Sequence, residues 1–237
     1  MTDMTTTDAQ GVRARVRREL TGEIVEAARR QLEDVGPAAL SLRAVAREVG
    51  MVSSAVYRYF PSRDELLTAL IIEAYDDLGE AAERAEAKVR RSDLIGRWRA
   101  ICRAVRRWSS EHPHEYALLY GTPVPGYDAP QTTMPSATRV TALLIGLLDA
   151  LATEKRDLGH DDAPAVPRPA RAAFASARAL MGPGPSDDLI VRGIAAWSWL
   201  FGAVSLELFG HRIGAVDRDA VFFDLEIDRM AAFIGLS

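Results

Sequence analysis

Residues 42–67 read LRAVAREVGMVSSAVYRYFPSRDELL, and this stretch decides the fold of the N-terminal part of the chain. Apolar residues recur at helical spacing over residues 42–49, and Gly50 ends that helix because glycine adopts a left-handed turn at little cost. A second short helix follows over residues 53–60 and stops at Pro61, which cannot continue a helix. Two short helices joined by a glycine turn predict a helix-turn-helix.

The second short helix carries more polar and aromatic side chains than the interior of a small domain can bury. Val56 and Phe60 are four residues apart and share one face, whereas Tyr57, Arg58 and Tyr59 are consecutive and point in three directions. In a helix-turn-helix the second helix lies in the DNA major groove and the first crosses the backbone. Hydroxyl and guanidinium groups suit phosphates and guanine, and a small methyl group suits thymine. The residues expected to contact DNA are Ser41, Arg43, Ser53, Ser54, Ala55, Tyr57, Arg58, Tyr59 and Arg63.

Charge is distributed unevenly along the chain. The formal net charge is −4, yet residues 11–63 hold 10 arginines against 6 acidic residues, whereas residues 64–237 are acidic. A basic N-terminal region favours double-stranded DNA as a partner. In the alternative interpretation Tyr57 and Tyr59 flank a core and the arginines are solvated surface. That alternative stays open for each residue, but it explains neither the short helix nor the basic region.

The composition indicates a cytoplasmic protein. Cys102 is the single cysteine, so no intrachain disulfide can form, and a reducing compartment is expected. The first residues, MTDMTTTDAQ, lack the apolar segment of a secretory signal. The longest apolar run, residues 194–206, is shorter than the roughly 20 residues that span a bilayer. No membrane partner is therefore expected.

Helical periodicity runs through most of the chain, and no segment alternates as a strand does. An apolar stripe over residues 20–35 ends at Gly36-Pro37, and Ser62 with Glu65 forms a capping box for a helix toward Lys88. Later helices are expected at about residues 94–108, 136–155, 174–180, 187–209 and 217–234. The fold class is therefore all-α, with a disordered tail over residues 1–15, a three-helix DNA-binding domain over residues 16–63 and a larger helical effector-binding and dimerisation domain over residues 64–237.

The penultimate helix has two apolar stripes, and a helix that is apolar on two faces must bury both. One stripe can pack on its own domain, and the other needs a partner such as a second copy of the chain. Gly202 would let a partner helix come close. A larger intrachain core is the alternative. The residues expected at a homodimer interface are Ala195, Trp199, Gly202, Leu206, Phe209, Phe223, Ile227 and Met230.

Aromatic and apolar residues on the intervening helices are candidates to line an effector cavity. Each of them also fits a plain core position, and the sequence leaves that alternative open. The candidate ligand-binding residues are Trp98, Ile101, Cys102, Val105, Trp108, Tyr116, Tyr120, Phe174 and Trp197.

The stretch LRAVAREVGMVSSAVYRYFPSRDELL resembles the signature of the TetR family of transcriptional regulators, and the resemblance extends over about residues 20–70. HPHEYALLYGTPVPGY and AWSWLFGAVSLE are similar to a subgroup of that family with a Trp-rich penultimate helix. One departure is Val52, where the family commonly has a serine or threonine that caps the second short helix. The resemblance implies a homodimer, a cavity for a small effector, and repression more than activation.

The expected function is a DNA-binding regulator that holds a partly palindromic operator as a dimer and is released by a small apolar or amphipathic effector. A helical enzyme or ligand-binding protein that retains the DNA-binding unit is the alternative, and a non-specific architectural DNA-binding protein is a third. No catalytic pattern supports an enzyme: His112 and His114 diverge on a helix, and no GxSxG elbow is present. No metal-ligand spacing and no cofactor motif is present either.

Overall fold

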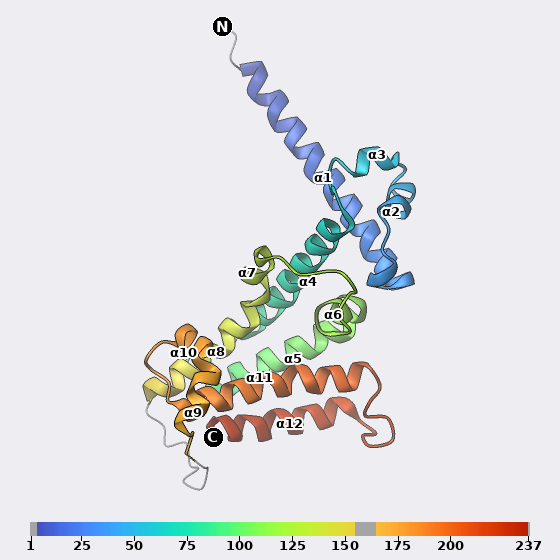
Figure 1. Cartoon of the computed structure of the whole chain (residues 1–237). Coiled ribbons are helices and arrows are strands. Elements are labelled where there is room, and N and C mark those ends of the chain that lie inside the picture. The colour runs from blue at the N-terminus through green and yellow to red at the C-terminus, as the bar shows by residue number, and fades with distance from the viewer. Residues whose placement is uncertain (1–3, 155–164, 237) are drawn as a thin grey trace. The chain divides into compact units, whose positions relative to one another are not determined.

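The computed structural model describes residues 4–154 and 165–236, and every regular element in those residues is helical, as predicted (Figure 1). The chain forms two compact units, and each unit is made of two separate segments of the chain. The first unit holds the residues up to Ala74 and His114–Thr133, and the second holds Tyr75–Pro113 and the residues from Met134 onward. The helices of the first unit are α1 (Met4–Val35), η1 (Pro37–Ala39), α2 (Leu42–Glu48), α3 (Ser53–Val56), the start of α4 (Arg63–Glu86), α6 (Pro113–Tyr120) and η2 (Gln131–Thr133). Those of the second unit are the rest of α4, α5 (Leu94–Glu111), α7 (Met134–Ala137), α8 (Arg139–Glu154), α9 (Arg168–Arg171), η3 (Ala172–Phe174), α10 (Ala175–Met181), α11 (Asp187–Leu208) and α12 (Asp219–Ile234).

The first unit is built on a shared apolar core. The α1 stripe predicted from the sequence is buried from Ile24 to Leu32, and Val56 and Phe60 are buried beneath the second short helix as expected. Leu66, Leu67 and Leu70 of α4 belong to the same core. The unit therefore extends past residue 63, where the sequence placed a domain boundary, because the first turns of α4 bury their apolar side chains here.

The helix-turn-helix is present, with a shorter second helix than the sequence predicted. Gly50 has φ of 67°, in the left-handed region that the turn requires. Helix α3 covers only Ser53–Val56, and Tyr57 to Tyr59 continue as turns before Pro61. Val52 at the N-cap provides no side-chain hydrogen bond, so the first backbone N–H groups of α3 have no cap.

Helix α1 begins earlier than expected. It is helical from Met4, whereas the sequence predicts a disordered tail over residues 1–15, and residues 1–3 lie outside the described part. Residues 11–19 are exposed on every face. Arg15 pairs with Glu19 one turn later at 3.7 Å, and such i,i+4 pairs support an exposed helix.

Helix α4 begins where the sequence predicted. The hydroxyl of Ser62 accepts a hydrogen bond from the backbone N–H of Glu65 at 3.1 Å. The helix ends at Glu86, close to the predicted end at Lys88. Because α4 starts in the first unit and ends in the second, it is the continuous element that both units share.

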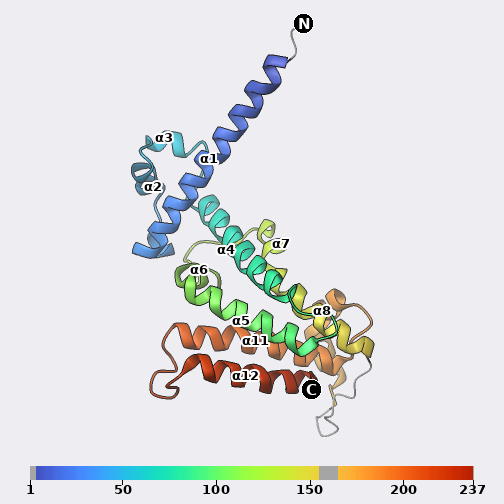
Figure 2. The ribbon, with the colours of Figure 1, turned by 180° about the vertical axis from the view of Figure 1, so that it is seen from behind.

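The second unit packs α5, α8, α11 and α12 around one core, in which α11 contacts all three of the others. Helices α11 and α12 lie side by side (Figures 1 and 2). The indole N–H of Trp98 on α5 donates to the carbonyl of Ile227 on α12 at 3.0 Å, so this buried polar atom is satisfied inside the core. Helix α8 ends at Glu154, and Lys155, the predicted end, lies outside the described residues.

Three arginines on α5 form ion pairs with acidic residues of α11 and α12. Arg99 pairs with Asp228 and Arg103 with Asp224, each at 2.8 Å. Arg106 makes two hydrogen bonds to Glu207 of α11. These pairs are partly or fully exposed, so they orient the helices more than they stabilise the unit.

Helix α11 is long and apolar enough to cross a membrane by composition alone. Half of its most apolar window is buried inside the unit, against α5, α8 and α12, which is the usual environment of a core helix. Its hydrophobicity therefore follows from its central position in the second unit.

Candidate nucleic-acid interface and effector site

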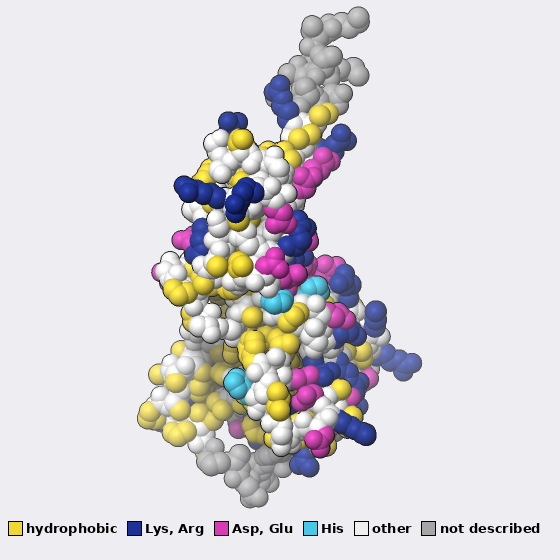
Figure 3. All heavy atoms as spheres, turned by 90° about the vertical axis from the view of Figure 1, so that its right-hand side faces the viewer, with side chains coloured by type: hydrophobic (Ala, Val, Ile, Leu, Met, Phe, Trp, Pro, Cys, Tyr) yellow, Lys and Arg dark blue, Asp and Glu magenta, His cyan; other side chains and the backbone are white. Residues whose placement is uncertain are grey.

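Several of the residues predicted to contact DNA are exposed on the surface of the first unit. Tyr57, Arg58 and Ser54 are exposed around α3 and the turn after it, and Arg43 is exposed on α2. Ser53, Ala55 and Tyr59 are half-buried. Basic side chains stand out among neutral ones around α2 and α3 (Figure 3).

An open depression brings four of these residues together. It has a volume of about 470 Å³ and lies between the start of α2, the turn after α3 and the start of α4. Arg43 and Tyr57 are exposed at its edge, which gives it a cation and a phenol donor suited to a phosphate. Its lining residues are Leu40, Ser41, Leu42, Arg43, Tyr57, Ser62 and Arg63.

Two members of the set have structural contacts that the sequence did not predict. Arg63 donates to the backbone carbonyls of Pro37 at 2.7 Å and Ala38 at 3.2 Å, which ties the start of α4 to η1. Ser41 occupies the N-cap position of α2 without a side-chain cap, and its backbone N–H donates to Gln31 at 2.6 Å. Both residues hold the helix-turn-helix in shape as well as lying beside the depression.

Arg17 also contacts this part of the molecule and was not among the residues predicted from the sequence. Its guanidinium donates to the backbone carbonyl of Arg58 at 3.3 Å and lies over the Tyr59 ring, 5.2 Å from the ring centroid. The turn that presents Arg58 is thus held from α1. An arginine 41 residues away from its acceptor gives no local signal, so periodicity could not have found this contact.

The nine candidate ligand residues are not brought to one cavity. Tyr116 and Tyr120 belong to the first unit, and the other seven belong to the second. Trp98, Ile101, Cys102 and Val105 are buried core residues of α5, and Phe174 is buried in η3. Burial raises the pKa of the Cys102 thiol well above its usual value, so this cysteine stays protonated and unreactive. Trp108 and Trp197 line two separate pockets, and Trp98 lines a third cavity of only about 10 Å³.

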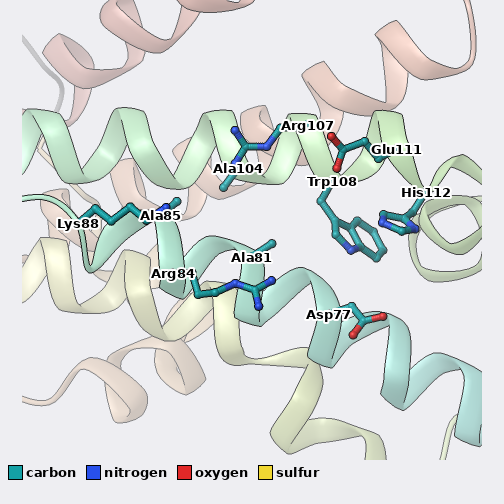
Figure 4. A pocket seen from close by; sticks show the side chains of 10 residues that line it. All are labelled: Asp77, Ala81, Arg84, Ala85, Lys88, Ala104, Arg107, Trp108, Glu111 and His112. Carbon is teal, nitrogen blue, oxygen red and sulfur yellow. The ribbon is translucent and has the colours of Figure 1, made fainter.

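Trp108 lies in a groove between α4 and α5, which has a volume of about 320 Å³ (Figure 4). The side chain is 5% exposed, and its ring stacks on His112 with the ring centroids 5.1 Å apart. Its indole N–H is buried without an acceptor. The sequence carried a signal for this groove, because Ala81 and Ala85 on α4 leave space beside a tryptophan-bearing helix. The lining residues are Asp77, Ala81, Arg84, Ala85, Lys88, Ala104, Arg107, Trp108, Glu111 and His112.

Trp197 lines a second pocket, of about 200 Å³, between α8, α10 and α11. Its walls are almost entirely hydrocarbon, so it can take an apolar group but offers little to orient a polar one. Its lining residues are Thr141, Leu144, Ile145, Leu148, Ala177, Leu180, Met181, Gly193, Ile194 and Trp197.

Arg139 of α8 holds the second half of α4 from another side. It donates two hydrogen bonds to Glu83, at 2.9 and 2.6 Å, and two to Asp76, at 3.0 Å to the carboxylate and 2.9 Å to the backbone carbonyl. The hydrogen bond from Arg139 lowers the pKa of the Glu83 carboxyl. Gly79 permits this approach, since a Cβ there would lie 2.7 Å from the Cβ of Arg139.

The predicted homodimer residues fall on two different faces. Leu206 of α11 and Phe209 just after this helix are exposed, and Ala195 and Gly202 are half-buried. Phe223 and Ile227 of α12 are buried inside their own unit, so assigning them to an interface was wrong. Trp199 stacks on Phe223 with centroids 5.6 Å apart and also belongs largely to the interior, and Met230 is half-buried.

Helix α12 has a different exposed apolar stripe. Together with exposed apolar residues of α11, this stripe forms what we call the apolar face. It leaves out Trp197 and Val221, which are also exposed. Several large apolar side chains exposed on two neighbouring helices favour an interaction site there. Its members are Val191, Ile194 and Leu206 on α11, Phe209 at the C-cap of α11, and Phe222, Leu225 and Phe233 on α12.

Among residues 4–154 and 165–236, no group of three or more histidine, cysteine, aspartate or glutamate side chains is placed to hold a metal ion. Helices α2 and α3, joined by the turn at Gly50 and followed by an exposed turn, define the class of this protein as a helix-turn-helix DNA-binding protein.

Comparison with known proteins identifies the family. Residues 24–70 match the family described as bacterial regulatory proteins of the tetR family, and residues 98–230 match the tetracyclin repressor-like C-terminal domain. The HTH-type transcriptional regulator Rv1816 of Mycobacterium tuberculosis is 45% identical over 206 residues, which cover 84% of this chain and 85% of that protein. The chain belongs to the TetR family and is a transcriptional regulator of TetR type.

Solved structures agree with this assignment. The crystal structure of the putative regulatory protein SCO4313 is 32% identical and covers 92% of this chain and 97% of its own, with a TM-score of 0.73. RolR, solved in complex with the ligand resorcinol, covers 94% of this chain and 95% of its own with a TM-score of 0.52. At 17% identity that second likeness shows a common fold.

Proposed function

We propose that this protein represses transcription by binding a partly palindromic operator as a homodimer and leaves the operator when a small effector binds the second unit. The observation that carries the DNA-binding half is the exposure of Tyr57 and Arg58 on a turn held by buried Val56 and Phe60. Rigid support beneath and polar groups outside are what base and phosphate recognition require.

The apolar face supports the dimer. It lies on the last two helices, where two copies of the pair would form a four-helix interface. Gly202 lies within the α11 part of this face, and a Cβ added to it would meet no atom of its own chain within 4 Å. The space beside Gly202 is therefore available to a helix of the second copy.

Helix α4 is the proposed connection between effector and operator. It carries core residues of the first unit, and its second half lines the Trp108 groove and is held by Arg139. An effector that favours a different position of this second half would shift the population of dimers with correctly spaced recognition turns. A solved TetR-fold protein with a bound small ligand, RolR, is consistent with such a use of the fold.

Replacing Tyr57 or Arg58 with alanine is expected to weaken operator binding while the protein stays folded, because both side chains are exposed. Loss of a bidentate base contact costs about 1–3 kcal/mol, which is roughly 5- to 150-fold in affinity. Footprinting upstream of the gene and its neighbours would supply the operator, and fluorescence anisotropy would give the affinities.

Arg168→Ala is the matched control, because it removes one exposed positive charge from α9 in the second unit. If Tyr57→Ala and Arg58→Ala both bind operator as tightly as this control while circular dichroism stays native, the turn after α3 does not read DNA.

Arg17→Gln is expected to weaken operator binding more than Arg18→Gln does. Both changes remove one positive charge from the same exposed part of α1, but only Arg17 contacts the Arg58 carbonyl and the Tyr59 ring. Equal losses in the two variants, with equal changes in salt dependence, would mean that Arg17 acts through its charge alone.

A further inference from the structure

The groove between α4 and α5 has a basic end. Figure 4 places Lys88 and Arg84 toward one end of it and Asp77 and His112 toward the other. Arg84 pairs with Glu80 at 2.6 Å on the exposed side of α4. Within the described part of the chain, Lys88 and Arg107 have no ion-pair partner. Positive charges gathered without a carboxylate between them favour an anion.

The middle of the groove is suited to hydrocarbon. Ala81 and Ala85 come from α4 and Ala104 from α5, and their methyl groups leave room between the helices. The Trp108 ring, backed by His112, closes one side. A flat apolar body can therefore lie against the alanines and the indole.

The indole N–H of Trp108 is an independent pointer to a ligand. It is buried without an acceptor in a side chain that is 5% exposed, whereas the Trp98 N–H in the same helix is satisfied. Buried donors nearly always have a partner. Because this nitrogen is inaccessible in the present arrangement, an acceptor reaches it only when the packing around the Trp108 ring loosens. A ligand that supplies the acceptor therefore favours the loosened arrangement.

We infer that the groove binds an amphipathic organic anion, with its acid group between Lys88 and Arg107 and its flat apolar body against the alanines and Trp108. Asp77 and Glu111 at the other end repel an anion, so they orient the ligand with its charge toward Lys88. This inference deepens the proposed function: the role of the ligand as effector rests on that function, whereas binding in the groove does not. The Trp197 pocket, which lacks cations, would take a neutral apolar molecule instead.

The test uses the full chain and a pair of fluorinated probes, 6-fluoro-2-naphthoate and its neutral amide, with binding followed by fluorine NMR. We expect the acid to bind about tenfold or more tightly than the amide, since a hydrogen bond to a charged group accounts for at least that ratio. Lys88→Gln and Arg107→Gln should each remove most of this preference. Arg168→Gln, an exposed arginine outside the groove, should leave it unchanged.

Three outcomes would overturn the inference: no binding of the acid, equal binding of acid and amide, or a preference that survives both groove substitutions. A Trp197→Ala variant that loses acid binding while Lys88→Gln keeps it would assign the ligand to the second pocket. If the acid binds with the expected dependence on Lys88 but operator affinity does not change, the groove chemistry stands and the effector role in the proposed function fails.

Discussion

Gly202→Arg is expected to give a folded monomer that has lost operator binding. The side chain would enter open space within its own chain, so the second unit has no reason to unfold. In a dimer built on the apolar face, the same arginine would place a bulky, unpaired charge against the partner helix. A monomer reaches one half-site and loses the second, about 34–36 Å away along the DNA.

Operator affinity of this variant should fall about a thousandfold or more, toward the level of non-specific binding. Sedimentation equilibrium measures the monomer fraction, and anisotropy measures the affinity. Ala142→Arg, at an exposed position on α8, is the control and should remain dimeric and bound. A folded Gly202→Arg protein that is dimeric and bound to operator would place the interface on another face.

The sequence was sufficient for the helix-turn-helix because each signal there is local. Gly50 ends α2, Pro61 ends the stretch after α3, and Ser62 starts α4, and each acts through its own backbone conformation or hydrogen bond. The predicted second short helix is longer than α3. Val56 and Phe60 are four residues apart, and this spacing fits consecutive turns as well as a continuous helix.

The face of α12 could not be chosen from the sequence. Phe222, Leu225 and Phe233 have helical spacing, and so do Phe223, Ile227 and Met230. Either stripe could pack on α5 and α11, and only the folded unit shows that Phe223 and Ile227 do so. Periodicity determines that a helix has two apolar faces, whereas the neighbouring helices determine which face is covered.

The groove and the contacts of Arg17 were missed for a related reason. Helical spacing does not distinguish the arginines of α5 from one another, yet Arg99, Arg103 and Arg106 form ion pairs while Arg107 lines the groove. Which arginine meets a carboxylate depends on helices more than 100 residues away along the chain. Charge counting along one helix cannot separate paired cations from those that remain available to a ligand.

Arg97→Met is expected to destabilise the protein by about 3–5 kcal/mol, the usual cost of removing one partner from a buried ion pair. Arg97 of α5 and Glu86 at the end of α4 are 6% and 2% exposed, and Arg97 Nε lies 2.5 Å from Glu86 Oε1. Without Arg97, the buried Glu86 carboxylate keeps only its ion pair with the exposed Arg91, so its negative charge is poorly stabilised in a low-dielectric site.

Arg91→Met is the matched control for this substitution. Arg91 bonds the same Glu86 oxygen at 2.6 Å, but its side chain is 75% exposed. Solvent already screens that contact, so its loss should cost only about 0–1 kcal/mol. Urea unfolding of both variants gives the two free energies of unfolding, and both are measured at one protein concentration because the stability of the proposed dimer would depend on concentration.

The double variant Glu86→Met/Arg97→Met tests whether the intact ion pair stabilises the protein or whether only the loss of one partner destabilises it. Hydrophobic side chains of similar volume often replace a buried ion pair with little loss, so we expect the double variant to be more stable than Arg97→Met alone. If instead Arg97→Met and Arg91→Met cost the same, burial does not govern this pair. The end of α4 would then be held to α5 by packing, with Glu86 contributing little.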